Sequence, residues 1–345
     1  MNKVETSRTA PVSLERQRPI LDSLLKYYIQ WLLLAAMIVL AALNANFRQP
    51  INLENILLQS AFAGIGAAGM TLLIISGAFD LSVAGILGVC GVVMATLVSR
   101  TSTVLGICAA LAVGVALGLL NGFVVTKLRI PAFIATLGMM NVYLGIGFIW
   151  TNGQVVSVAM PAQVNLTTGV VGAATPFVLT LGTGSLFGIL PIPFLVMAVV
   201  YGLCYVVLRR THFGRFLRAV GSSEPAARAV GIPVARVRIL CFATVAVCTA
   251  IAAVLLTGEL SSANAIMATG YELNVIAIVV VGGTSLQGGQ GTLLGSFTGA
   301  LFFTVISNAL NIFGVGAYWQ YVVSGVLLIS AIAVQALRTF VFAAE

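Results

Sequence analysis

The sequence predicts an all-α polytopic membrane protein with about ten transmembrane helices. Of its 345 residues, 60% are apolar and only 8% are charged, and the mean hydropathy is +1.10. A soluble domain carries about 25% charged residues, so this chain has too few charges to cover a surface that faces water. The composition therefore excludes a disordered chain, a disulfide scaffold and a soluble enzyme with a membrane anchor.

Charged residues are so sparse that they mark the ends of the expected helices. Uncharged stretches lie between charged positions 26 and 48, 54 and 80, 80 and 100, 100 and 127, and 238 and 259. Each stretch has a length suited to a membrane-spanning helix, which needs about 20 residues. Turn residues divide two longer uncharged stretches and leave a polar, Gly-rich loop at 152–190. The resulting helices are expected near 132–151, 191–208, 273–287, 293–311 and 318–336.

The distribution of Lys and Arg predicts the orientation. If the N-terminus is cytoplasmic, only Arg48 and Arg100 of the 17 basic residues fall on the outer side. This asymmetry follows the positive-inside rule and favours an N-in, C-in protein. Cytoplasmic tails at 1–26 and 339–345 then flank one transmembrane domain at 27–338, with a periplasmic loop at 152–190 and a cytoplasmic loop at 209–238. The net charge of +8 reflects loops beside anionic lipid and requires no nucleic acid.

The sequence offers no constellation for catalysis, metal binding or nucleotide binding. It lacks the phosphate-binding motif G-x-x-x-x-G-K-[ST], paired carboxylates and a nucleophile elbow. Its one histidine, His212, has no partner at a useful spacing, and its five cysteines show no ligand pattern. We expect no catalytic residues, no metal and no cofactor in this chain.

Glycines are spaced for close helix packing. Gly114, Gly118 and Gly122 recur every four residues, as do Gly295 and Gly299. Small residues at this spacing let the backbones of neighbouring helices approach in a membrane. A bundle with such glycines and few intramembrane charges suits transport of a neutral solute.

The loop at 209–238 contains a short helix with both ends specified. Ser222 or Ser223 can cap its start, and Pro225 fits the first turn. Gly231 supplies a left-handed stop, after which Pro233 prevents continuation. The sequence predicts a small, flat docking surface for a cytoplasmic partner, made of Ala226, Ala227 and Val230. An alternative is an interfacial helix that rests on anionic lipid through its arginines.

Three further segments carry turn chemistry. Asp80 would be costly in the bilayer centre, so we expect it at the cytoplasmic boundary, capping the helix that follows. The run Lys127 to Pro131 is a basic turn that starts the fifth span. The glycines of 282–291 permit an irregular turn whose backbone groups Thr284 and Ser285 can satisfy.

These segments resemble one known family. The stretch 214–232, the core Asp80-Leu81-Ser82-Val83, the run 129–138 and the glycines of 282–291 are similar to ribose/xylose/arabinose-type permeases of bacterial ABC importers. The resemblance covers residues from about 50 to 337, and the superfamily also includes branched-chain amino-acid permeases. The pattern departs from the family at Ala78, Phe79 and Ala84, which replace Gly, Ile and Gly, and at Asn274, where relatives commonly have Asp.

The resemblance implies a type II ABC importer permease fold in the bacterial inner membrane that imports a monosaccharide or sugar-like solute. It implies a homodimer or a heterodimer with a similar permease, a periplasmic solute-binding protein, and a separate ATPase subunit that binds ATP and Mg. The residues implied for ATPase coupling are Gly221, Ser223, Glu224, Ala226, Ala227 and Gly231. Those implied for the structural motifs are Asp80, Gly282, Gly283, Gly288 and Gly289.

Two other functions remain open from the sequence. An ion-coupled secondary transporter would need an intramembrane ionisable residue, for which the sequence offers only Asp80. An ABC permease for another small solute, such as an amino acid or a nucleoside, is the second alternative. The candidates for lining a substrate path are four intramembrane asparagines, each of which could instead form a hydrogen bond between helices: Asn121, Asn141, Asn308 and Asn311.

Overall fold

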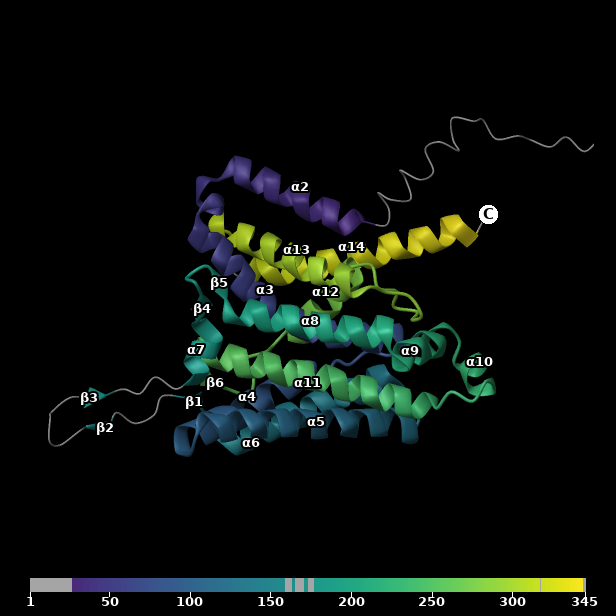
Figure 1. The fold of residues 1–345 in the computed structure, drawn as a ribbon, viewed down its shortest axis with the longest axis horizontal. Coiled ribbons are helices and arrows are strands. Elements are labelled where there is room, and N and C mark those ends of the chain that lie inside the picture. Colours follow the sequence, from purple (N-terminus) through teal and green to yellow (C-terminus); the bar gives the residue numbers. More distant parts are fainter. Residues whose placement is uncertain (1–26, 159–162, 165–170, 173–176, 317, 344–345) are drawn as a thin grey trace, which may run out of the picture.

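The protein is a bundle of long helices that lie roughly side by side (Figure 1). A computed structural model describes residues 27–158, 163–164, 171–172, 177–316 and 318–343. The expected tail at 1–26 lies outside these residues, as does the end of the tail at 339–345. Two short helices, α9 (His212–Ser222) and α10 (Glu224–Ala229), lie at one end of the bundle, and both described chain ends lie at the same end (Figure 1).

Most predicted spans coincide with helices. Seven described helices are long and apolar enough to cross a membrane, so the chain is a multi-pass membrane protein. They are α3 (Pro50–Ile75), α4 (Val83–Arg100), α5 (Thr103–Lys127), α6 (Ala132–Thr151), α8 (Ile192–Arg210), α11 (Val234–Leu260) and α13 (Leu293–Ile312). The remaining expected spans correspond to α2 (Tyr28–Leu43), α12 (Tyr271–Val281) and α14 (Tyr318–Ala343), and a 3₁₀ turn, η1 (Ala45–Arg48), joins α2 to α3.

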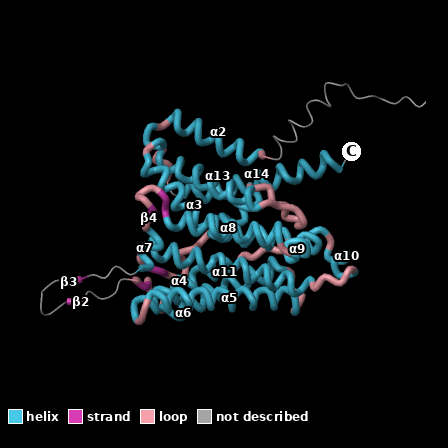
Figure 2. Tube along the Cα trace, viewed as in Figure 1, coloured by secondary structure: helices cyan, strands magenta, loops and turns pink. Residues whose placement is uncertain are grey.

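The segment 152–190 is more structured than the loop predicted for it. It contains α7 (Phe177–Thr183), in which Gly182 packs closely against Gly258 at the end of α11. Short strands lie at the end of the bundle opposite α9 and α10 (Figure 2). Antiparallel pairing joins β1 (Val156–Ser157) to β6 (Ser262–Ala263), β2 (Gln163–Val164) to β3 (Val171–Gly172), and β4 (Ser185–Leu186) to β5 (Leu190–Pro191). These pieces are too short for apolar periodicity to reveal them.

The glycine ridge of α5 packs against α11, as the sequence predicts. A Cβ on Gly118 would lie 2.5 Å from the Ala246 Cβ and 2.8 Å from the Phe242 carbonyl oxygen. A Cβ on Gly114 or Gly122 would meet α11 equally closely. The absence of side chains therefore sets the distance between these two helices.

The helix expected near 273–287 is present but shorter: it begins at Tyr271 and ends at Val281. The 11 residues of this helix, α12, rise about 16 Å, roughly half of the hydrocarbon core. Its C-terminal Gly282 packs against Gly295 at the start of α13. From β6 to Gly270 the chain is not helical, so this crossing combines an irregular half with a helical half.

Candidate functional site

Capping residues define the two short helices of the loop at 209–238. The Thr211 hydroxyl accepts a hydrogen bond from the Gly214 N–H (3.3 Å) at the start of α9. Of the two serines predicted to cap α10, Ser223 does so, because its Oγ accepts from the Ala226 N–H at 3.4 Å. Gly231, with φ of +80°, ends α10 as predicted. Helix α9 was not anticipated from the sequence.

The outer surface of α10 differs from the predicted one. Ala226 and Ala229 are exposed, and Val230 is 76% exposed, but Ala227 is only 3% exposed and joins the core. Helix periodicity does not separate the two sets, because positions 226, 227 and 230 span the same arc as positions 226, 229 and 230, so the burial of Ala227 decides which residues face outward. The expected surface of Ala226, Ala227 and Val230 is therefore wrong at Ala227, and Ala229 takes its place.

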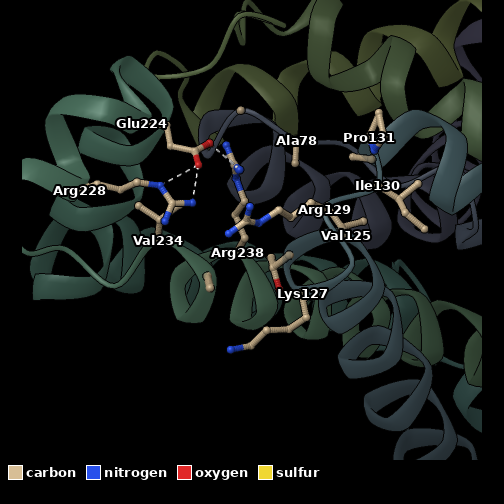
Figure 3. A pocket seen from close by; sticks show the side chains of 14 residues that line it. Ala78, Val125, Lys127, Arg129, Ile130, Pro131, Glu224, Arg228, Val234 and Arg238 are labelled. Atoms are coloured by element: carbon tan, nitrogen blue, oxygen red, sulfur yellow. Dashed lines mark hydrogen bonds and ion pairs between the residues drawn. The ribbon is translucent and has the colours of Figure 1, made fainter.

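Ion pairs connect α10 to the long helix α11. The Glu224 Oε1 atom lies 2.6 Å from Arg228 Nη2, and its Oε2 atom lies 2.7 Å from Arg238 Nη1. Figure 3 shows the carboxylate between the two guanidinium groups. The hydrogen bond from Arg228, together with the nearby charge of Arg238, lowers the pKa of Glu224 against the opposing effect of burial. The start of α10 is thereby fixed to the second turn of α11.

Glycines from three separate motifs meet behind α9 and α10. A Cβ on Gly221, at the end of α9, would overlap the Ile75 carbonyl oxygen at the end of α3. The same carbonyl accepts a hydrogen bond from the Gly289 N–H at 2.8 Å. Gly77 and Gly288, both with positive φ, approach each other so closely that a Cβ on Gly288 would lie 3.0 Å from the Gly77 Cα. We call Gly77, Gly221, Gly288 and Gly289 the glycine junction.

The glycine junction connects separate parts of the bundle. It brings the backbone of α9 into contact with the end of α3 and with the turn that joins α12 to α13. Packed backbone therefore joins α9 to α3 and to the turn after α12, and Glu224 joins α10 to α11. Gly221 is a packing residue at this junction and lies behind the exposed face of α10.

A cavity of about 650 Å³ lies beside the junction. It is lined by Lys127 and Arg129 from the turn between α5 and α6, and by Glu224, Arg228 and Arg238. Figure 3 shows these residues around the cavity, with Lys127 extending away from Glu224. Basic residues from two separate loops thus gather at one end of the bundle, which fits the predicted charge asymmetry.

Asp80 does not cap α4. Ser82 holds the N-cap position, and the Asp80 Oδ1 accepts hydrogen bonds from the Ser82 N–H (2.8 Å) and Oγ (2.6 Å). Asn121 Nδ2 donates to Asp80 Oδ2 at 3.0 Å, and the Tyr143 hydroxyl donates to Asn121 Oδ1 at 2.7 Å. Asp80 is fully buried, so it belongs to a polar network that joins α4, α5 and α6.

The four asparagines proposed for a substrate path have different surroundings. Asn121 is buried in the Asp80 network, and Asn308 is buried and donates to the Asn52 Oδ1 atom at 2.8 Å. Asn311 is exposed and accepts from Gln320 Nε2 at 2.8 Å. Asn141 is exposed on α6 and donates to a carbonyl of its own helix. The structure does not bring the four together, and three of them, Asn121, Asn308 and Asn311, form hydrogen bonds to another element.

The remaining motif glycines shape the turn after α12. Gly282 packs against Gly295 of α13, and Gly283 has φ of +86°, a conformation that favours glycine. Among the described residues, no group of three or more His, Cys, Asp or Glu side chains is arranged to hold a metal ion.

Its long apolar helices make this chain a multi-pass helical membrane protein, with α9 and α10 seated at one end of the bundle (Figure 1). Residues 52–332 match the family described as the permease component of the branched-chain amino acid transport system. The chain belongs to this family.

Curated relatives match over most of their length. The ribose import permease protein RbsC of Escherichia coli K12 is 37% identical over 303 residues, which cover 88% of this chain and 91% of the relative. RbsC of Bacillus subtilis is 34% identical and covers 94% of this chain and 97% of the relative. The L-arabinose transport system permease protein AraH of E. coli K12 is 34% identical, covering 83% of each chain. No solved structure gives a significant match.

Proposed function

We propose that the chain is the transmembrane permease subunit of an ATP-driven ABC importer that carries a monosaccharide or sugar-like solute into the bacterial cytoplasm. The names of the relatives support this substrate class, since ribose and L-arabinose are both pentoses. The location is the inner membrane, with both termini and α10 in the cytoplasm. The chain crosses the bilayer ten times, counting the segment from β6 to α12 as one crossing.

The observation that carries the proposal is the way α10 is seated. Its outer surface of Ala226, Ala229 and Val230 is small and exposed, while its inner side is fixed by Ala227, Glu224 and the glycine junction. This arrangement suits a helix that receives motion from a separate ATPase subunit and transmits it to several spans. ATP and Mg belong to that subunit, because the sequence lacks a phosphate-binding loop.

Two further partners complete the transporter. A periplasmic solute-binding protein delivers the sugar to the outer end of the bundle, where α7 and the short strands lie. A second copy, or a similar permease, supplies the other half of the transmembrane pathway. Membrane lipid covers the apolar outer surface.

The first test is purification of tagged chain from gently solubilised native membranes, followed by reconstitution with the proteins that copurify. We expect a P-loop ATPase, and ATP-dependent uptake of ribose or arabinose. The variant Ala226→Arg should abolish uptake and loosen the ATPase while leaving the chain folded. Ala227→Arg is unsuitable for this purpose, because it places a charge in the core.

The same preparation tests the ion-coupled alternative. If no ATPase copurifies, and uptake continues after ATP depletion but stops when ion gradients are dissipated, the chain is a secondary transporter. ATP-dependent uptake of an amino acid or nucleoside, without uptake of sugars, would instead retain the importer and change its substrate.

A further inference from the structure

The crossing between α11 and α13 is interrupted near the middle of the bundle. After β6 the chain turns back between the spans, and Met267 packs closely against Gly91 in the middle of α4. The Tyr271 hydroxyl at the start of α12 donates to the Phe62 carbonyl in the middle of α3 at 3.0 Å. We call residues 264–274 the interrupted segment. The contacts of Met267 and Tyr271 place the neighbouring Glu272 level with the middle of α3 and α4.

The backbone of the interrupted segment is held by its own turns. Asn264 Oδ1 accepts from the Ile266 N–H at 3.0 Å, and the Thr269 N–H donates to the Ile266 carbonyl at 3.1 Å. Gly270, with φ of +83°, then starts α12. Non-helical backbone at membrane depth is tolerated only where protein covers it or where it lines a water-filled cavity.

One side of the segment is not covered by the described part of this chain. Ile266 is 54% exposed, Leu273 is 51% exposed, and Thr269 between them is also exposed. The opposite side is packed tightly, since Ala265, Ala268 and Tyr271 are all buried. The exposed side therefore meets either water, a second copy of the chain, or lipid.

The environment of the Glu272 carboxyl group distinguishes between water, a second copy and lipid. Its carboxyl group interacts with the backbone at Gly270, but its Oε2 atom is buried and accepts no hydrogen bond from the described residues. No ion pair within the described residues involves Glu272. A carboxylate at membrane depth without a cation is expensive in lipid and marks a functional pathway. A water molecule or a hydroxylated ligand can supply the missing donor when the Glu272 side chain turns toward the exposed side of the segment.

We propose that the interrupted segment lines the solute path, and that Glu272 and Thr269 hydrogen-bond the hydroxyl groups of a neutral sugar as it passes. A carboxylate accepts hydrogen bonds, and the Thr269 hydroxyl, which donates to the Ile266 carbonyl at 2.8 Å, can accept another, so the pair matches the hydroxyl donors of a sugar. Interrupted helices with loosened backbone form the binding sites of other transporters at the bilayer midplane. The chemical role assigned to Glu272 rests on the proposed sugar import; the aqueous exposure of Thr269 does not.

Thiol accessibility tests the exposure. In the assembled transporter, with exposed Cys108 replaced by serine, Thr269→Cys should react with a membrane-impermeant thiol reagent. Leu119→Cys, on the exposed surface of α5, is the matched control and should stay unreactive. Equal reactivity of the two variants would overturn the proposal. Ribose or arabinose should slow the modification if a pentose is the solute; labelling without protection by either supports the path and contradicts the pentose assignment.

Transport kinetics test the role of the carboxylate. Glu272→Gln should raise the KM for uptake severalfold while retaining ATPase stimulation by the binding protein. Glu259→Gln, which changes an acid at the end of α11, is the matched control and should transport as the unmodified chain does. If Glu272→Gln leaves the KM unchanged, or lowers uptake only in proportion to folded protein, Glu272 does not contact the solute.

Discussion

Gly221 is a position where a single methyl group has a large effect. A Cβ there would overlap the Ile75 carbonyl oxygen and approach the Gly289 nitrogen to 2.5 Å. Gly221→Ala should therefore destabilise the junction by about 1–3 kcal/mol, the usual cost of overpacking. Thermal unfolding in detergent measures this loss. Gly202→Ala, in α8 where a Cβ meets open space, is the control and should unfold no earlier than the unmodified chain.

The ion pairs of Glu224 should make the stability of the fold depend on pH. Its pKa in the folded chain lies below its ordinary value of 4.5, so its ion pairs stabilise the fold above that value and stop doing so as the pH falls through the folded pKa. Partly exposed ion pairs contribute about 0.2–1 kcal/mol. Glu224→Gln should thus unfold slightly earlier than the unmodified chain at neutral pH.

Measuring the unfolding of Glu224→Gln and of the unmodified chain over a range of pH checks the direction of this effect. The difference should disappear once the carboxyl group is protonated in acid. Arg236→Gln, an exposed arginine that forms no ion pair in the described part of the chain, should show no such dependence. A difference that persists or grows in acid would contradict the assignment of Glu224.

The roles of residues that act on their own turn could be predicted from the sequence more reliably than the direction in which a side chain points. Ser223, Pro225 and Gly231 act locally, so their roles at the ends of α10 follow from their chemistry. Asp80 and Ala227 depend on neighbours that are distant in the chain. Nothing in the local sequence indicates that Asn121 lies beside Asp80.

At the scale of elements, the contact between α5 and α11 depends on small residues. Gly118→Val adds a branched side chain where even a Cβ meets the Ala246 side chain and the Phe242 backbone. We expect the helices to separate and the stability to fall by about 1–3 kcal/mol or more. Ala116→Val, on the exposed side of the same helix, is the control and should change little. Equal thermal stability of the two variants would show that α5 does not depend on this contact.

Helix α9, which the sequence did not predict, and α12, which is shorter than expected, both differ from an apolar span of full length. Helix α9 is amphipathic and lies in a charged loop, and α12 covers only half of a crossing. Counting uncharged residues finds spans of full length, because hydropathy measures how long an apolar stretch is. It does not reveal where the backbone inside such a stretch leaves the helix, as it does before Tyr271. That interruption lies against α3 and α4, where Tyr271 donates to the Phe62 carbonyl and Met267 packs against Gly91.

At the scale of the whole molecule, the ends of the bundle have distinct roles. One end gathers the basic cavity, the glycine junction and α10, and the other carries α7 and the short strands. The interrupted segment lies between them and reaches the junction through α12, whose following turn contributes Gly288 and Gly289. Backbone contacts at the junction thus connect α9, which precedes α10, to the turn that follows α12, the helix that begins at Tyr271.

This polarity requires a fixed orientation in the membrane. Thr101 follows α4 at one end and Ala229 lies on α10 at the other, and both residues are exposed. In intact spheroplasts carrying Cys108→Ser, Thr101→Cys should react with an impermeant thiol reagent, and Ala229→Cys should react only after permeabilisation. This outcome follows from the positive-inside rule, since the arginines surround Ala229. The reverse pattern would place α10 in the periplasm, where no ATP is available, and the chain could not then be driven by an ATPase through this helix.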